Sequence, residues 1–120
     1  MIRAVLGFIV VLCSAGFAAA QEVTSAPGGT LRALDKTSGD TLDVEMIVGQ
    51  SRQVGRLQVL MSDCRYPTGN PSGNAYALLE IVEAGKPGTL FSGWMIASSP
   101  ALSSMEHPRY DVWVIRCNTS

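Results

Sequence analysis

The sequence has few of the residues that usually carry catalysis or bind metals. Its 120 residues include one histidine and three cysteines. A structural zinc site takes about four Cys or His ligands, and thiol redox enzymes use a Cys-x-x-Cys motif, which does not occur here. We therefore expect no metal and no cofactor, and the residue content alone indicates no particular reaction.

Charge is also scarce. Charged residues make up 16% of the chain, the formal net charge is −1, and Lys and Arg form no cluster. Nucleic-acid-binding proteins need a basic patch to neutralise phosphates, and polybasic segments attract anionic lipids. We therefore expect neither a nucleic acid nor a lipid surface as a partner.

The first twenty residues have the features of a secretory signal peptide. Arg3 precedes an apolar run over residues 4–12, and Ala18–Ala20 form a small-residue cleavage site before Gln21. The run is too short to cross a bilayer core of about 30 Å. We predict a signal peptide over 1–20, export to the periplasm and no membrane span in the mature chain.

Two cysteines, Cys64 and Cys117, remain after this segment is removed. An even cysteine count in an exported domain indicates a disulfide. On the chain-entropy model, closing a loop of this length stabilises the fold by about 4 kcal/mol. Reactive or metal-binding thiols are the alternative, but one histidine and two cysteines supply too few ligands for a metal. We predict one structural disulfide.

The apolar pattern predicts strands and no convincing helix. In residues 41–48, apolar and acidic side chains alternate with the period of a half-buried strand. Residues 89–97 are apolar on both faces, so we predict that this strand lies centrally in its sheet. The other strands are expected over residues 30–35, 56–64, 75–83 and 110–117. In these strands the alternation places Val59 and Met61 on one face and Cys64 on the opposite face, Leu79 and Ile81 inward, and Trp113 on the same face as Cys117.

Turns rich in Gly, Pro, Asn and Asp separate these strands. The sequence therefore predicts an all-β fold, a small antiparallel β-sandwich or partly closed barrel of about six strands with one disulfide. Residues 30–120 would form a single domain after a flexible lead-in over 21–29. Apolar residues flank Trp94 and Trp113, so both are predicted in the core, with a stacking platform for a sugar as the alternative.

Two long loops, over residues 65–74 and 98–109, are expected between the strands. Loops on a rigid sheet often carry binding residues, and the second loop contains the single histidine. The predicted binding residues are Ser98, Ser99, His107, Arg109 and Asp111.

Catalysis has less support in the sequence. Ser104, His107 and Asp111 are close in sequence, but a catalytic triad needs contact in space and usually joins distant segments. No Gly-x-Ser-x-Gly elbow is present. Two acidic residues could act as glycosidase carboxylates, yet solvent-facing positions on strands explain them more simply. These acidic candidates are Glu80, Glu83, Glu106 and Asp111.

We assign no catalytic residue. The main hypothesis is a non-catalytic periplasmic module that binds an envelope protein or a cell-wall component through its loops, or serves as an accessory to an envelope complex. The alternative is a small hydrolase that acts on a cell-envelope glycan or peptide.

Four segments together resemble one protein family. They are LDKTSG, GRLQV, CRYPTGNPSGNAYALLEI and FSGWMIASSPALSSMEHPRYDVWVIRC. They are similar to the DUF2155 family of exported alphaproteobacterial proteins, and the likeness extends over residues 31–117. The combination of Ser-Ser-Pro, His-Pro and Tyr-Asp-x-Trp makes it specific. The resemblance implies a periplasmic protein with paired cysteines, and it implies no activity because the family is one of unknown function.

Overall fold

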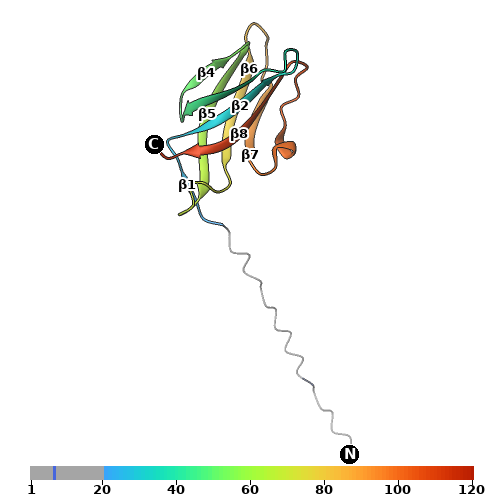
Figure 1. Cartoon of the computed structure of the whole chain (residues 1–120). Coiled ribbons are helices and arrows are strands. Elements are labelled where there is room, and N and C mark those ends of the chain that lie inside the picture. The colour runs from blue at the N-terminus through green and yellow to red at the C-terminus, as the bar shows by residue number, and fades with distance from the viewer. Residues whose placement is uncertain (1–6, 8–20) are drawn as a thin grey trace, which may run out of the picture.

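Two antiparallel sheets pack face to face as a sandwich in the computed structural model, which describes Gly7 and residues 21–120 (Figure 1). The larger sheet has the order β1-β5-β6-β7, with β4 also paired to β5, and the smaller sheet has the order β3-β2-β8. The elements are β1 (Val23–Ser25), β2 (Gly28–Asp35), β3 (Thr41–Ile47), β4 (Ser51–Val54), β5 (Leu57–Pro67), β6 (Tyr76–Glu83), β7 (Phe91–Ile96), the 3-10 helix η1 (Pro100–Ser103) and β8 (Tyr110–Asn118). The predicted all-β sandwich is confirmed.

β1 and β4 lie outside the predicted strands. β1 pairs with residues 65–67 of β5, so the segment expected as a flexible lead-in contains a strand. This pairing also extends β5 to Pro67, and Arg65 lies within a strand and not in the loop predicted to start there. The apolar pattern did not predict β4, because its sequence is mostly polar and only Val54 of its four residues is buried.

The predicted signal peptide over 1–20 falls outside the described residues. Within the part of the chain that the structure describes, no helix is long and apolar enough to cross a membrane.

The buried core follows the predicted alternation in β5 and β6. Val59 and Met61 of β5 and Leu79 and Ile81 of β6 are almost fully buried. A register shift between Met61 and Asp63 then reverses the alternation in β5. The sequence pattern had placed Cys64 on the face opposite Met61, but the bulge turns it into the core.

The predicted disulfide joins Cys64 of the larger sheet to Cys117 of the smaller sheet, with the two Cα atoms 5.7 Å apart. The close approach requires a glycine beside it, because a Cβ on Gly29 would lie 2.9 Å from the Cys64 sulfur. Such a bond indicates an oxidising compartment outside the cytoplasm.

The prediction of a central strand over residues 89–97 is wrong, because among the strands of residues 21–120 β7 pairs with β6 alone and forms an edge of the larger sheet. Its apolar residues divide between two surfaces. Met95 packs in the core, whereas the side chain of Trp94 is 36% exposed. The strand is apolar on both sides because its outer side lines a surface groove, described below.

Trp113 was also predicted in the core, and this prediction is wrong. A register shift in β8 follows Val114, which pairs with Leu31, so the inward positions are Val112 and Val114 before the shift and Cys117 after it. Trp113 was expected to share a face with Cys117, but the bulge separates them. Trp113 is half-buried on the outer face of the smaller sheet.

Candidate functional site

The predicted binding residues lie at opposite ends of the sandwich. Ser98 follows β7, where the side-chain amide of Asn74 donates to its hydroxyl at 2.8 Å and its backbone N–H donates to the Asn74 oxygen at 3.0 Å. His107 reaches Glu83 at the far end of β6. The eight residues of β6 span about 25 Å. Ser98 and the adjacent Ser99 therefore cannot share a small ligand with His107.

His107 holds the start of β8 against the end of β6. Its Nδ1 accepts hydrogen bonds from the backbone N–H groups of Arg109 and Tyr110, at 3.0 and 3.1 Å. This places the ring hydrogen on Nε2, which lies 3.2 Å from a carboxylate oxygen of Glu83. The two side chains are only 7% and 8% exposed. Both ring nitrogens are therefore engaged within the protein.

The contact with His107 lowers the pKa of Glu83. The hydrogen bond from His107 holds the pKa of Glu83 below its ordinary value, against the opposing effect of burial. Lys86, whose ammonium lies 3.6 Å from the same carboxylate oxygen, lowers the pKa further.

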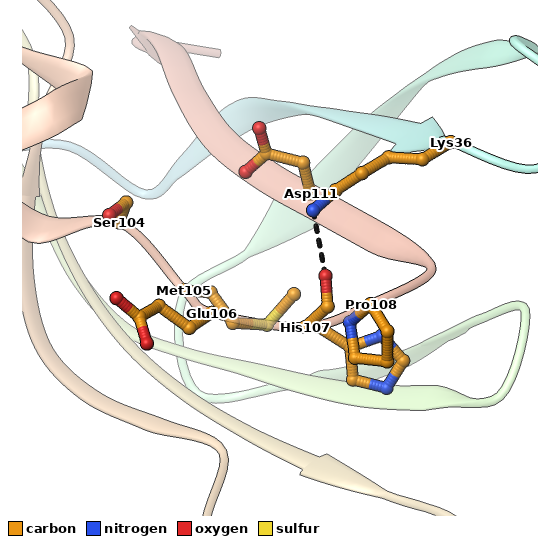
Figure 2. Close-up of a pocket in the computed structure, with 7 residues that line it drawn as sticks. All are labelled: Lys36, Ser104, Met105, Glu106, His107, Pro108 and Asp111. Atoms are coloured by element: carbon orange, nitrogen blue, oxygen red, sulfur yellow. Dashed lines mark hydrogen bonds between the residues drawn. The ribbon is translucent and has the colours of Figure 1, made fainter.

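Arg109 and Lys36 tie the same segment to the turn after β2. Arg109 Nη2 lies 3.1 Å from Asp35, and its guanidinium carbon lies 5.1 Å from the centre of the Tyr110 ring. The Arg109 hydrogen bond lowers the pKa of Asp35. The ammonium of Lys36 donates to the backbone carbonyl of His107 at 2.7 Å (Figure 2). His107 and Arg109 thus have clear structural roles.

An open hollow of about 520 Å³ lies beside this segment, and we call it the polar hollow. Figure 2 shows the carboxylate of Asp111 on one side and that of Glu106 on the other, with the His107 ring directed away from Asp111. Within the described residues, no group of three His, Cys, Asp or Glu side chains could hold a metal. The polar hollow is lined by Lys36, Ser104, Met105, Glu106, His107, Pro108 and Asp111.

A second surface, which the sequence did not predict, lies on the outer face of the larger sheet. It is a mainly apolar groove of about 400 Å³, and we call it the Trp94 groove. Val23 at its rim is 40% exposed and Trp94 is 36% exposed. The groove is lined by Gln21, Val23, Arg65, Tyr76, Trp94 and Ile96.

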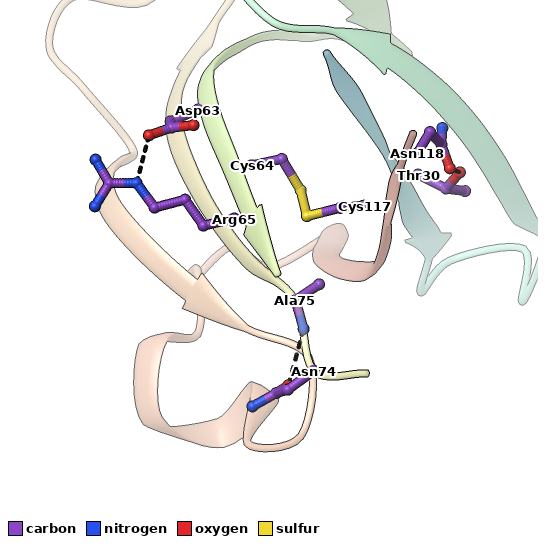
Figure 3. Close-up of a disulfide and its surroundings, with 8 residues drawn as sticks. All are labelled: Thr30, Asp63, Cys64, Arg65, Asn74, Ala75, Cys117 and Asn118. Carbon is purple, nitrogen blue, oxygen red and sulfur yellow. Dashed lines mark hydrogen bonds and ion pairs between the residues drawn. A yellow bond between two sulfur atoms is a disulfide. The ribbon is translucent and has the colours of Figure 1, made fainter. Parts of the chain in front are cut away.

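Strand pairing brings these residues together. Tyr76 pairs with Arg65 on one side and with Ile96 on the other. The β5 bulge directs Arg65 and Asp63 to the outer face while Cys64 points into the core (Figure 3). Four separate segments of the sequence therefore meet, and no local sequence motif predicts the groove.

Arg65 and Tyr76 are held in place by their neighbours. Arg65 Nε donates to Asp63 at 2.7 Å, and the guanidinium carbon lies 4.9 Å from the centre of the Trp94 ring. The Tyr76 hydroxyl accepts a hydrogen bond from Asn74 at 3.3 Å and contacts the side-chain oxygen of Gln21 at 3.4 Å. The groove thus combines a cation, two aromatic rings and aliphatic side chains.

Comparison with known proteins places this domain in a family. A family model described as "Uncharacterized protein conserved in bacteria (DUF2155)" matches residues 29–117. The chain belongs to the DUF2155 family. The matched region contains both cysteines and the groove residues Arg65, Tyr76, Trp94 and Ile96. The family predicted from the sequence is confirmed.

An uncharacterised protein of Rickettsia prowazekii (strain Madrid E) is 27% identical to this DUF2155 protein over 99 residues. The alignment covers 80% of this chain and 64% of the relative, so the chain spans less than two thirds of the length of that protein. No solved structure matches. Neither the family nor the relative indicates a function.

Proposed function

We propose that this DUF2155 domain is an exported, non-catalytic binding module of the bacterial envelope, and that the Trp94 groove is its contact surface. The presence of Trp94, Tyr76 and Arg65 on one solvent-facing surface supports this proposal most directly. Trp, Tyr and Arg are the residue types most enriched where protein interfaces gain their binding energy. An apolar depression on an outer sheet face is also typical of an interaction site.

Export to the periplasm is supported by two features. The Cys64–Cys117 bond fits an oxidising compartment. The apolar leader before Gln21 has the length and cleavage-site residues of a signal peptide.

A hydrolase at the polar hollow has less support. A general base needs a ring nitrogen within reach of the proton that it removes. Nδ1 of His107 accepts two backbone hydrogen bonds and Nε2 faces Glu83. In this proposal His107 and Arg109 keep the loop in place, and Asp111 at the polar hollow is a secondary candidate for contact with a partner.

Site-specific photo-crosslinking in living cells tests the proposal. A photo-crosslinking amino acid replaces Val23 at the groove rim of the full chain or, in a control, Leu42, which is 59% exposed on the smaller sheet. We expect a discrete envelope adduct from position 23 and none of the same mass from position 42. Trp94→Ala should reduce the adduct at least about 10-fold, as for an interface hot spot, and Trp113→Ala should leave it unchanged.

Three results would contradict the proposal. They are no adduct from position 23, the same adduct from both positions, or an adduct that Trp94→Ala leaves intact. Disulfide formation and the thermal unfolding midpoint of each variant serve as controls for folding.

A further inference from the structure

Arg65 is the one charged residue that lines the Trp94 groove, and its hydrogen-bonding capacity is only partly used. A guanidinium carries five N–H donors in a planar fork. Nε donates to Asp63. Among the hydrogen bonds of residues 21–120, none has an Nη atom of Arg65 as donor. The outer end of the fork is therefore available to a ligand.

Two contacts fix the direction of this fork. The Asp63 carboxylate holds the Nε side at 2.7 Å, and the guanidinium carbon lies over the Trp94 ring, 4.9 Å from its centre. A cation that lies over the face of an aromatic ring is positioned and partly dehydrated. An anion that binds the two Nη groups therefore meets donors that are already oriented, which lowers the entropic cost of binding.

The donors favour a planar anion. A carboxylate accepts two parallel hydrogen bonds from an Arg fork. A phosphate group carries up to two negative charges, whereas this groove offers a single cation with Asp63 beside it. Polybasic clusters attract anionic membranes, and none is present here.

The rest of the groove selects an apolar neighbour for that carboxylate. Val23 and Ile96 supply aliphatic surface, and the exposed part of Trp94 supplies an aromatic ring. A volume of about 400 Å³ is within the usual range for pockets that hold small ligands, so it accommodates a short chain end. At a polypeptide C-terminus, the carboxylate and the last side chain share one Cα, so both reach a shallow groove together.

We propose that the Trp94 groove binds the C-terminal end of a partner polypeptide. The terminal carboxylate accepts hydrogen bonds from the Nη groups of Arg65, and the last, apolar side chain packs against Trp94 and Ile96. This inference rests on the proposed function and adds the chemistry of the partner. Capture of C-terminal carboxylates is an established mode of peptide recognition.

Peptide binding to the exported, full-length gene product purified from the envelope tests this chemistry. The probes are acetylated pentapeptides that end in Leu, Val or Phe, each prepared as a free acid and as a C-terminal amide. NMR titration follows the Arg65 Nε–H and Trp94 indole signals. We expect at least one free acid to bind about 10-fold more tightly than its amide, because the amide removes the charge-assisted pair.

Arg65→Gln should abolish the preference for the free acid, and Arg65→Lys should restore it only in part because an ammonium lacks the fork. Arg32→Gln is the matched control, since Arg32 also pairs with an aspartate on an outer face. The inference is overturned if acids and amides bind equally, or if Arg65→Gln keeps the preference. It is also overturned if an internal Asp in an amidated peptide binds as well as a free C-terminus, or if inorganic phosphate competes at equal concentration.

The two proposals fail differently. A Trp94-dependent adduct at position 23 without binding of any free acid would support the binding module and overturn the proposal that the groove binds a polypeptide C-terminus. Absence of the adduct together with absence of peptide binding would remove both.

Discussion

The outer faces of the two sheets carry similar charged pairs that differ in how much of the arginine is used. On the smaller sheet, Arg32 donates to both oxygens of Asp43, from Nε at 2.7 Å and from Nη2 at 3.1 Å. On the larger sheet, Arg65 donates to Asp63 through Nε alone. The first pair uses two N–H donors on one side of the guanidinium, and the second uses Nε alone, which leaves both Nη groups of Arg65 without a protein acceptor.

The tryptophans on the two faces differ in the same sense. Trp113 pairs with Arg32 across β2 and β8, and within the described residues the cation–π contacts involve Trp94 and Tyr110 but not Trp113. Trp94 lies on an edge strand under Arg65, in a groove with Tyr76. Both faces are hollowed beside their tryptophan, and they differ in whether the aspartate pairs with the arginine through one or two hydrogen bonds. Residue content alone therefore does not predict which arginine keeps both Nη groups free of protein acceptors.

The largest expected effect concerns the bond that joins the two sheets. We expect replacement of both cysteines, Cys64→Ala with Cys117→Ala, to lower the free energy of unfolding by about 4 kcal/mol, because the unfolded chain regains the freedom of the closed loop. Urea unfolding of the oxidised protein and of the double variant measures this. Equal midpoints would show that packing alone holds the two faces together.

A smaller effect is expected at the end of the sandwich away from the groove. The pKa of Glu83 is lower in the folded than in the unfolded chain, where it has its ordinary value of 4.5. Ionised Glu83 therefore stabilises the fold at every pH above that value. This contribution is lost as the pH falls through the lower, folded pKa. Glu83→Gln should therefore lower the thermal midpoint at pH 7 and reduce the further loss between neutral and acid pH.

Glu80→Gln is the control, because Glu80 lies on the same strand and is exposed. An acid sensitivity in Glu83→Gln equal to that of the unchanged protein would contradict the role of the His107 hydrogen bond. Binding at the Trp94 groove should not respond to Glu83→Gln. This result would show that the contact between His107 and Glu83 acts on stability and not on binding at the groove.

The sequence predicted the parts of this comparison that depend on local pattern. Alternation identified the inward residues of β5 and β6, such as Val59 and Leu79, because each strand has one face in the core. The cysteine count identified the disulfide because only two cysteines follow the predicted signal peptide. The family followed from the quoted segments and is confirmed by the match over residues 29–117.

The groove could not be predicted in the same way. The bulges in β5 and β8 each reverse the alternation, which moves Cys64 into the core and Trp113 out of it. Apolar residues on both faces of β7 predicted a central strand, since the pattern records burial but not whether a second sheet or a surface groove provides it. Arg65 joins Trp94 only through pairing of three strands, which is a property of the tertiary fold.

The smallest effects sharpen the comparison between the two arginines. Arg32→Gln removes two hydrogen bonds within the fold, so we expect a slightly lower thermal midpoint and unchanged peptide binding. Arg65→Gln removes one such bond and the contact with the Trp94 ring, so we expect a similarly small change in midpoint together with loss of the preference for a free C-terminus. Parallel thermal unfolding and NMR titration of the two variants test this crossed pattern. Equal effects of both variants on binding would mean that the surface charge, and not the open fork of Arg65, attracts the carboxylate.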